Sequence, residues 1–362
     1  MDCKVIRILR IEAMPDYFLP PEWAPQSGTM LTWPHRESYW QDNMAAIDRV
    51  FVDVAKAVGA RQKLLISCLD EAHELHIKQL LLSEQVNLSR VFIYQVRADD
   101  IWVRDHGPLS VIHQGGPLLL DFAFNGWGNK YPEDNNNQND NLLTRNLHDK
   151  GAFNVLRKEI NMALEGGGIE VDGHGTLLAT RSNLFAKTRN PHLSEQEIEA
   201  QLKHYFGLNR ILWLEHGALA GDDTDGHIDT LARFARPNTI CYMQCTDPQD
   251  EHFDALKAME EELTAFKDYQ GNPYRLVPLP WPKAHYAAFD GKRLPITYAN
   301  FLIINGAVLV PTYNDPADLK ALSIIADCFP DREIIAVLAG PVVEWYGSIH
   351  CMTMQLLQGI LK

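Results

Sequence analysis

The sequence predicts an α/β protein that folds as one domain over residues 1–362. Segments with strand-like and helix-like patterns alternate along the chain, with turn signals between them. No long stretch rich in proline, serine or glycine divides the 362 residues, and 46% of them are hydrophobic, so one large core can form. Symmetry among the alternating units is not visible, because no sequence signature of the usual repeat kinds recurs.

The first half of the chain contains three predicted strands and two predicted helices. Apolar side chains at Met44, Ile47 and Phe51 recur at helical spacing and predict a helix. The predicted strands cover residues 29–33, which end at Pro34, 63–67 and 90–96, and the predicted helices cover 43–58 and 71–82.

The second half continues the same alternation. Ser194 is expected to cap a helix, because Glu197 follows three residues later. The predicted helices cover residues 194–205, 250–266 and 316–326, and the predicted strands cover 210–214, 300–310 and 333–337. The asparagine-rich segment 133–141 is expected to be a solvated loop.

Charge and cysteine usage narrow the class of protein. A net charge of −14 argues against a nucleic-acid partner, which needs basic patches, and is compatible with a small cationic substrate. Residues 1–7 contain no apolar leader core, and no apolar run reaches membrane-spanning length. The six cysteines are too widely spread for a disulfide framework. We therefore expect a cytoplasmic protein with free thiols and no membrane partner.

Cys351 is the first candidate for chemistry. A lone cysteine is more often a small buried apolar residue than a nucleophile. Gly347 and Ser348 favour a turn before it, and a turn can expose a thiol. Residues 352–358 could form a short helix that ends at Gly359, which would place Cys351 at a helix N-terminus and lower its pKa.

His227 and Asp229 are the next candidates. Residues 226–234 alternate as in a strand, so side chains two positions apart would point to the same face. His227 and Asp229 would then project side by side. The simpler interpretation is a solvated strand edge.

Metal sites are poorly supported. Asp223 and Asp225 resemble part of an EF-hand loop, but Gly221 stands where the first ligand belongs. Cys241 and Cys245 have an unusual spacing for zinc, and no second pair follows. We therefore expect no metal.

Two further motifs carry carboxylates. Asp105 follows Arg104 in a short apolar run, and a strand there would place Trp102 and Arg104 on one face and Asp105 on the other. A surface salt bridge between Arg104 and Asp105 is the simpler interpretation. Glu165 precedes three glycines, which permit either close backbone approach or a flexible turn.

Together these residues suggest chemistry on a guanidinium group. A guanidinium is planar and cationic, and it pairs bidentately with carboxylates. Hydrolysis at its central carbon needs a thiolate, carboxylates that hold the two sides, and a histidine that transfers protons. The residues that supply these groups are Cys351, Asp105, Asp229, Glu165 and His227.

The ordered set of motifs resembles the agmatine deiminase family, which belongs to the guanidino-group-modifying (pentein) superfamily and is related to bacterial-type peptidylarginine deiminases. The similarity covers almost the whole chain. The matching motifs are Met14-Pro15, Glu22-Trp23, Leu31-Thr32-Trp33-Pro34, Asp100 to Pro108, Phe124 to Gly128, Glu165-Gly166-Gly167, Val171-Asp172-Gly173, Arg189-Asn190-Pro191, Asp225 to Asp229, Tyr298 to Phe301, Val310-Pro311 and Ile349-His350-Cys351.

The resemblance implies a fold that the linear pattern does not show. It is a five-bladed αβ-propeller built from pseudo-fivefold ββαβ units, with a single catalytic domain over residues 1–362. The implied activity is hydrolysis of agmatine to N-carbamoylputrescine and ammonia through a covalent cysteine intermediate, in putrescine biosynthesis. No metal or organic cofactor is implied.

Roles for single residues follow from the matching motifs. By resemblance Cys351 is the nucleophile and His227 the general acid and base. Asp105 and Asp229 grip the guanidinium nitrogens, and Glu165 supports the histidine. Trp102, and with it Trp127, is implied to line the substrate channel.

Two departures from the family pattern affect the substrate more than the reaction. Residues 345–348 stand where relatives often carry a glycine run, and Asp225 replaces a frequent asparagine. Peptidyl-arginine or free arginine is the nearest rival substrate, although free arginine would need a cationic partner for its carboxylate. A cysteine amidase that acts on a neutral carbonyl and a non-enzymatic binding scaffold are rival functions. The sequence does not reveal the oligomeric state, and a homo-oligomer stays open.

Overall fold

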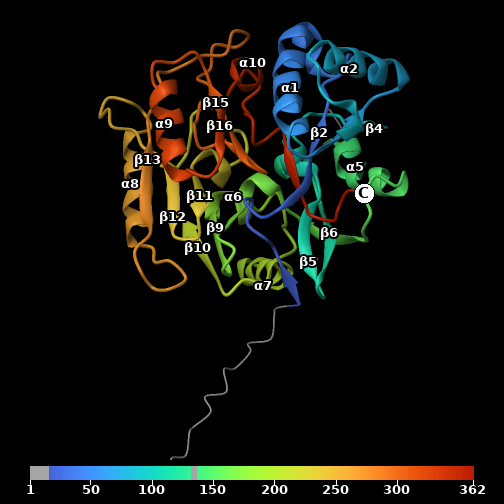
Figure 1. Cartoon of the computed structure of the whole chain (residues 1–362). Helices are drawn as coiled ribbons and strands as arrows, with labels where there is room; N and C mark the ends of the chain where they lie inside the picture. The colour runs from blue at the N-terminus through green and yellow to red at the C-terminus, as the bar shows by residue number, and fades with distance from the viewer. Residues whose placement is uncertain (1–15, 132–136) are drawn as a thin grey trace, which may run out of the picture.

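The computed structural model describes residues 16–131 and 137–362 and shows a mixed α/β fold. The features predicted at residues 1–7, at Cys3 and at Met14-Pro15 lie outside the described residues. Figure 1 shows helices along the outside of the molecule, with the strands between them. No described helix combines the length and apolar character that crossing a bilayer requires.

The strands of the described residues form five sheets. Each sheet contains an antiparallel pair followed by a parallel neighbour. The strand orders are β1 (Tyr17–Phe18), β5 (Leu109–His113), β6 (Gly116–Ala123), β7 (Arg157–Ala163); β10 (Arg210–Leu214), β9 (Thr176–Thr180), β8 (Glu170–Val171); β11 (Ala232–Arg236), β12 (Thr239–Met243), β13 (Arg275–Leu279); β14 (Leu302–Ile304), β15 (Ala307–Thr312), β16 (Glu333–Leu338); and β17 (Met354–Leu357), β2 (Gln26–Thr32), β3 (Lys63–Cys68), β4 (Val91–Gln95).

A helix precedes the parallel strand in each sheet, as a parallel crossover requires. The last strand, β17, pairs antiparallel with β2, so a strand from the C-terminal end of the chain lies beside an early strand (Figure 1). The α-helices are α1 (Met44–Gly59), α2 (Glu71–Ser83), α3 (Val103–His106), α4 (Gly126–Asn129), α5 (Gln138–Asp149), α6 (Arg181–Leu184), α7 (Glu195–Phe206), α8 (Phe253–Ala265), α9 (Asp318–Cys328) and α10 (Gly340–Val343), and short 3₁₀ turns include η1 (Tyr39–Asn43), η2 (Leu88–Arg90), η4 (Gly166–Gly168) and η5 (Ile228–Thr230).

Most predicted elements are confirmed to within a few residues, because their apolar faces are buried as the patterns require. Helix α1 buries Ile47 and Phe51 completely. Helix α7 begins after Ser194, whose side chain and that of Glu197 form the predicted capping box.

Two predicted strands that carry polar candidates are wrong. Residues 102–105 lie at the start of α3, a single helical turn that the Gly107 N–H closes by donating to the Val103 carbonyl at 2.9 Å. Residues 226–234 become a strand only at Ala232. The Thr230 hydroxyl donates to the His227 carbonyl at 2.9 Å and folds the preceding residues into η5.

Two other secondary-structure predictions, both in the C-terminal half of the chain, are wrong. Residues 352–358 form strand β17 rather than a helix, because Met354 and Leu356 alternate into the core beside β2. The strand predicted over 300–310 is a hairpin of β14 and β15, since Gly306 turns the chain with a φ of +73°.

The prediction of a solvated loop over residues 133–141 is wrong for residues 137–141, the part that the structure describes. Helix α5 begins at Gln138, and Asn137 and Asp140 are fully buried. Asp140 accepts hydrogen bonds from the backbone N–H groups of Asp99 and Asp100 at 2.7 and 3.2 Å. The polar side chains therefore fix a neighbouring segment instead of facing water. Residues 133–136 lie outside the described residues.

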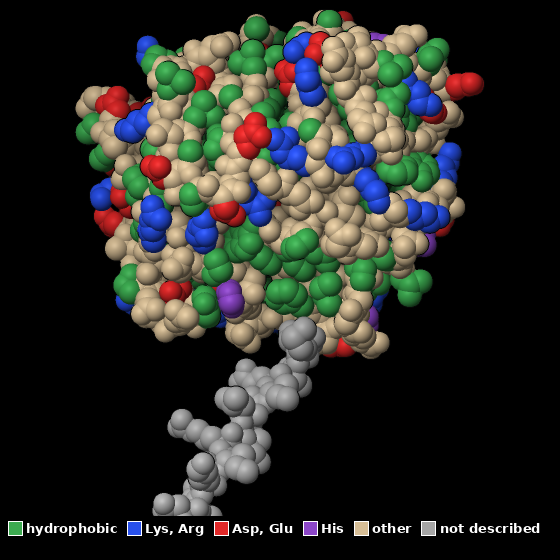
Figure 2. Space-filling view, in the orientation of Figure 1, with side chains coloured by type: hydrophobic (Ala, Val, Ile, Leu, Met, Phe, Trp, Pro, Cys, Tyr) green, Lys and Arg blue, Asp and Glu red, His purple; other side chains and the backbone are tan. Residues whose placement is uncertain are grey.

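Basic and acidic side chains are interspersed with uncharged ones on the face of the molecule shown in Figure 2. The acidic net charge of the chain therefore does not produce one large acidic field on this face.

Candidate active site

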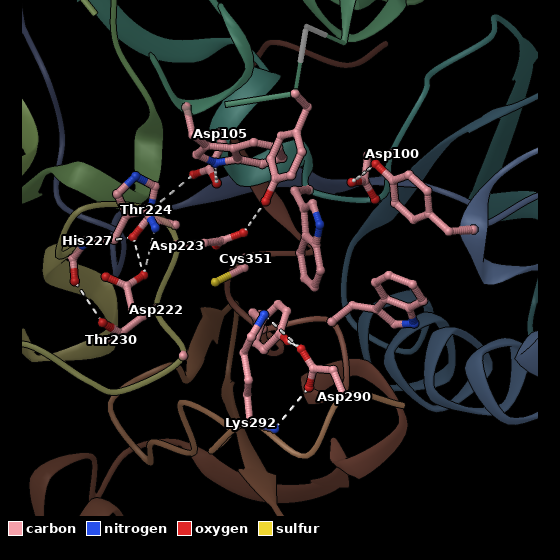
Figure 3. Close-up of a pocket in the computed structure, with 18 of the residues that line it drawn as sticks. Asp100, Asp105, Asp222, Asp223, Thr224, His227, Thr230, Asp290, Lys292 and Cys351 are labelled. Carbon is pink, nitrogen blue, oxygen red and sulfur yellow. Dashed lines mark hydrogen bonds and ion pairs between the residues drawn. The ribbon is translucent and has the colours of Figure 1, made fainter. Parts of the chain in front are cut away.

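One cavity of about 530 Å³ brings the predicted site residues together. Its wall includes Cys351, His227, Asp105, Trp102 and Trp127. Two other predicted residues lie behind this wall. Asp229 contacts Cys351, and Glu165 contacts His227. Figure 3 shows the Cys351 sulfur in the middle, with Asp105 and His227 to one side.

Cys351 lies in a turn that leads into β17, and its side chain is 6% exposed. The sulfur is 3.2 Å from Asn300 Nδ2 and 3.8 Å from Asp229 Oδ2. Burial, followed by the charges of Asp229 and Asp105, raises the pKa of the thiol well above its ordinary value. The prediction of a lowered pKa at a helix start is wrong, because a strand follows. The resting group is a neutral thiol.

His227 is fully buried between two carboxylates. Its Nδ1 lies 3.6 Å from Asp105 Oδ1, and its Nε2 lies 3.4 Å from Glu165 Oε2. Burial alone would lower the pKa of His227, but the charges of Asp105 and Glu165 raise it to about 9. The imidazole is therefore protonated at neutral pH. Within the part of the chain that the structure describes, its Nδ1 has no hydrogen-bond partner.

Asp105 is buried on α3 and lines the cavity. The Trp127 indole N–H donates to its Oδ2 at 3.0 Å, and the Gly167 N–H donates to its Oδ1 at 3.1 Å. Burial raises the pKa of Asp105 to about 6, although the neighbouring His227 cation opposes the rise. Arg104 is buried as well and donates to Gln355 at 2.6 Å, so the two residues form no surface salt bridge.

The glycines after Glu165 permit the predicted close backbone approach. A Cβ at Gly167 would lie 2.5 Å from His227 Nδ1 and 2.9 Å from Asp105 Oδ1. Glu165 itself accepts from Arg189 Nε at 2.7 Å. Burial would raise the pKa of Glu165, but Arg189 and His227 lower it to about 2. Glu165 is therefore a fixed anion behind the imidazole.

Asp229, whose Oδ2 lies 3.8 Å from the Cys351 sulfur, is also an anion. Burial opposes ionisation, but His350 lowers the pKa of Asp229 below its ordinary value. His350 Nδ1 is 2.7 Å from Asp229 Oδ2, and its Nε2 is 2.7 Å from Glu22 Oε2. His350 therefore bridges the carboxylates of Asp229 and Glu22. Asp229 Oδ1 is buried and has no hydrogen-bond partner among the described residues.

Two tryptophans shape the wall. Trp102 packs against Gly347, where a Cβ would approach its ring to 2.2 Å. Trp127 has a φ of +52°, in a turn in which the Gly128 N–H donates to Asn125 Oδ1 at 3.0 Å. This turn aims the indole N–H at Asp105.

Several residues that support the site were not assigned a role from the sequence. They are Arg189, which holds Glu165, His350 and Glu22, which hold Asp229, and Asn300, which contacts the thiol. Each of these residues lies within a motif that matches the family pattern, and this match is the sequence signal that could have identified them. Among the described residues, no group of three or more His, Cys, Asp or Glu side chains is placed to hold a metal ion.

The mixed α/β fold and a buried thiol set among an imidazole and carboxylates define an enzyme of the deiminase class. A family model described as Porphyromonas-type peptidyl-arginine deiminase matches residues 18–356. The chain belongs to this family.

Named relatives and solved structures agree with the family. The agmatine deiminase of Stutzerimonas stutzeri is 34% identical over 94% of this chain and 95% of its own length. The structure of a putative arginine deiminase from Porphyromonas gingivalis is 46% identical, with a TM-score of 0.88 over 96% of this chain and all of that one. The structure of C. jejuni agmatine deiminase with substrate bound is 34% identical, with a TM-score of 0.86 over 96% and 97% of the two chains.

Proposed function

We propose that the protein is an agmatine deiminase, which hydrolyses agmatine to N-carbamoylputrescine and ammonia. The observation that carries this proposal is a buried thiol beside the carboxylate of Asp229, one oxygen of which has no hydrogen-bond partner in residues 16–131 and 137–362. A buried anionic oxygen of this kind favours a cationic group as its ligand. The name of the 34%-identical relative supports the choice of agmatine.

The guanidinium binds between Asp105 and Asp229, the two carboxylates whose charges act on the thiol. Both carboxylates raise the pKa of Cys351, so a bound cation that neutralises them lowers this pKa. The substrate therefore assists formation of the thiolate that attacks it. The protonated His227 lies beside Asp105 and can give a proton to the departing nitrogen.

The reaction then proceeds in two halves. The Cys351 thiol loses its proton to solvent, and the thiolate forms a C–S bond to the guanidinium carbon. A C–N bond then breaks, and ammonia leaves with a proton from His227. Water next attacks the amidino-thioether, and His227 accepts its proton. The C–S bond breaks as the new hydroxyl on the carbon gives its proton to the departing sulfur, which releases the ureido product and returns the thiol of Cys351.

The rest of the cavity suits the remaining part of agmatine. Trp102 and Trp127 provide apolar walls for an alkyl chain. Asp222 and Asp223 also line the cavity and favour a cationic tail. Lys292, the one lysine or arginine among the described lining residues, is paired with Asp290 at 2.9 Å.

The proposal extends to the architecture and setting of the enzyme. The five ββαβ sheets are proposed to be the blades of an αβ-propeller, and residues 1–362 a single catalytic domain. The pairing of β17 with β2 supports this arrangement. A role in putrescine biosynthesis and a cytoplasmic location stay predictions.

Turnover of purified protein tests the function and its nucleophile together. We expect ammonia and N-carbamoylputrescine from agmatine, and loss of turnover by at least about 10³-fold in Cys351→Ala. Cys245→Ala, at a buried cysteine outside the cavity wall, is the matched control and should keep activity. Full activity of a folded Cys351→Ala protein would contradict the mechanism.

Arginine-containing substrates are the second candidate, because the 46%-identical structure is described as a putative arginine deiminase. Free arginine and benzoyl-arginine amide are therefore assayed beside agmatine. A higher kcat/KM for either one would replace agmatine as the substrate without changing the chemistry.

A further inference from the structure

Tyr346, on the cavity wall, has an unusual backbone conformation. Its φ is +70°, in the left-handed region that disfavours residues with a Cβ. The residues around it hold this conformation in place. The Tyr346 N–H donates to the Val343 carbonyl at 2.8 Å, and the next residue, Gly347, is pressed against the Trp102 ring.

The side chain of Tyr346 joins two segments of the cavity wall. Its hydroxyl donates to Asp290 Oδ2 at 2.9 Å, and Lys292 pairs with the same carboxylate. The Ala288 N–H donates to Glu344 Oε2 at 3.0 Å and forms a second link between the segments. Figure 3 shows Asp290 and Lys292 on the other side of Cys351 from Asp105.

Aromatic rings extend this wall to the surface. Trp345 is stacked between Tyr39 and Phe289, with ring centroids 5.2 and 5.1 Å apart. Phe289 is 55% exposed, whereas Cys351 is 6% exposed, so the wall runs from solvent toward the thiol. We call this outer part, formed by residues 288–292 and 344–347, the mouth of the cavity.

We infer that Tyr346 determines specificity by narrowing the mouth. It admits guanidino compounds with a slim alkylamine tail and excludes arginine that carries a blocked main chain. This inference rests on the proposed function, since it concerns the substrate of the same site. The hydrogen bond to Asp290 fixes the Tyr346 ring in position on the cavity wall.

Variants at Tyr346 test the inference with two defined substrates. The readout is kcat/KM for benzoyl-arginine amide divided by kcat/KM for agmatine. Tyr346→Gly removes the ring and suits the backbone, and we expect this ratio to rise at least about tenfold. Tyr346→Asn, a smaller residue that tolerates the left-handed region, should raise the ratio in the same direction if the glycine variant does not fold. Tyr346→Phe, which keeps the ring, should raise the ratio less.

Gln114→Gly is the matched control. Gln114 also has a positive φ, +49°, but it is exposed in the turn between β5 and β6 and does not line the cavity. This variant should leave the ratio unchanged. An unchanged ratio in active Tyr346→Gly and Tyr346→Asn proteins would overturn the inference alone, as would a wild-type preference for benzoyl-arginine amide. A wild-type protein that turned over neither substrate would overturn the proposed function and, with it, the inference.

Discussion

The charge of His227 depends on carboxylates that surround it. We expect Glu165→Gln to move the basic limb of the kcat/KM pH profile to lower pH, because loss of this charge removes one cause of the raised pKa of His227. In the wild type this limb should lie near pH 9. Profiles measured with agmatine across this limb check the shift.

Exposed Glu159 provides the control for this change, since it pairs with Arg145 at the surface. Glu159→Gln should keep the wild-type profile. The raised pKa of His227 also makes the stability of the folded protein depend on pH. A His pKa raised in the folded state adds stability that is fully present below about pH 6.5 and is lost as the pH rises through about 9. An identical basic limb in Glu165→Gln would contradict the role given to Glu165.

At the residue scale, the sequence predicted which side chains gather at the cavity, but it did not predict most of the residues that hold them in place. A cysteine, a histidine and several acidic residues are rarely needed together except at a reactive site. This combination is what pointed to Cys351, His227 and the three carboxylates. Arg189 and His350 have many possible roles, and only the folded chain shows that they fix Glu165 and Asp229. Their partners lie 24 and 121 residues away, beyond the reach of local pattern.

At the scale of elements, sequence pattern succeeded where one local signal dominates. The apolar face of α1 and the cap of α7 are of this kind. Sequence pattern failed at β17, because four residues are too few to distinguish a helical period from an alternating one. What makes this segment a strand is its pairing with β2, which comes from the other end of the chain. The pattern failed at η5 because a side-chain hydrogen bond overrides the alternation there.

The cap of α7 provides an element-scale prediction. Ser194→Ala should lower the free energy of unfolding by about 1 kcal/mol, because the Glu197 N–H loses its acceptor. Urea denaturation measures this loss. The kcat/KM for agmatine should not change, since Ser194 does not line the cavity. A loss of activity in folded protein would show that α7 is coupled to the site.

Glu22 links distant parts of the whole molecule. Its carboxylate accepts from Arg233 on β11 at 2.8 Å and from His350 at 2.7 Å, and it accepts from the backbone N–H of Ile303 on β14 at 2.7 Å. Burial opposes its ionisation, but His350 and Arg233 keep the pKa of Glu22 far below its ordinary value. One anion therefore ties two sheets to the segment that carries Cys351 and also positions Asp229 through His350.

Glu22→Gln should consequently change stability and catalysis together. We expect the free energy of unfolding to fall by roughly 3 kcal/mol, because buried Arg233 and His350 lose a shared anion. Since His350 then holds Asp229 less firmly, kcat/KM for agmatine should fall as well. Glu37→Gln is the control, because Glu37 pairs with Arg97 at the surface and its loss should cost at most about 1 kcal/mol. Urea denaturation and agmatine turnover measure both effects. If Glu22→Gln lost stability but kept full kcat/KM, Glu22 would join the sheets without positioning the site.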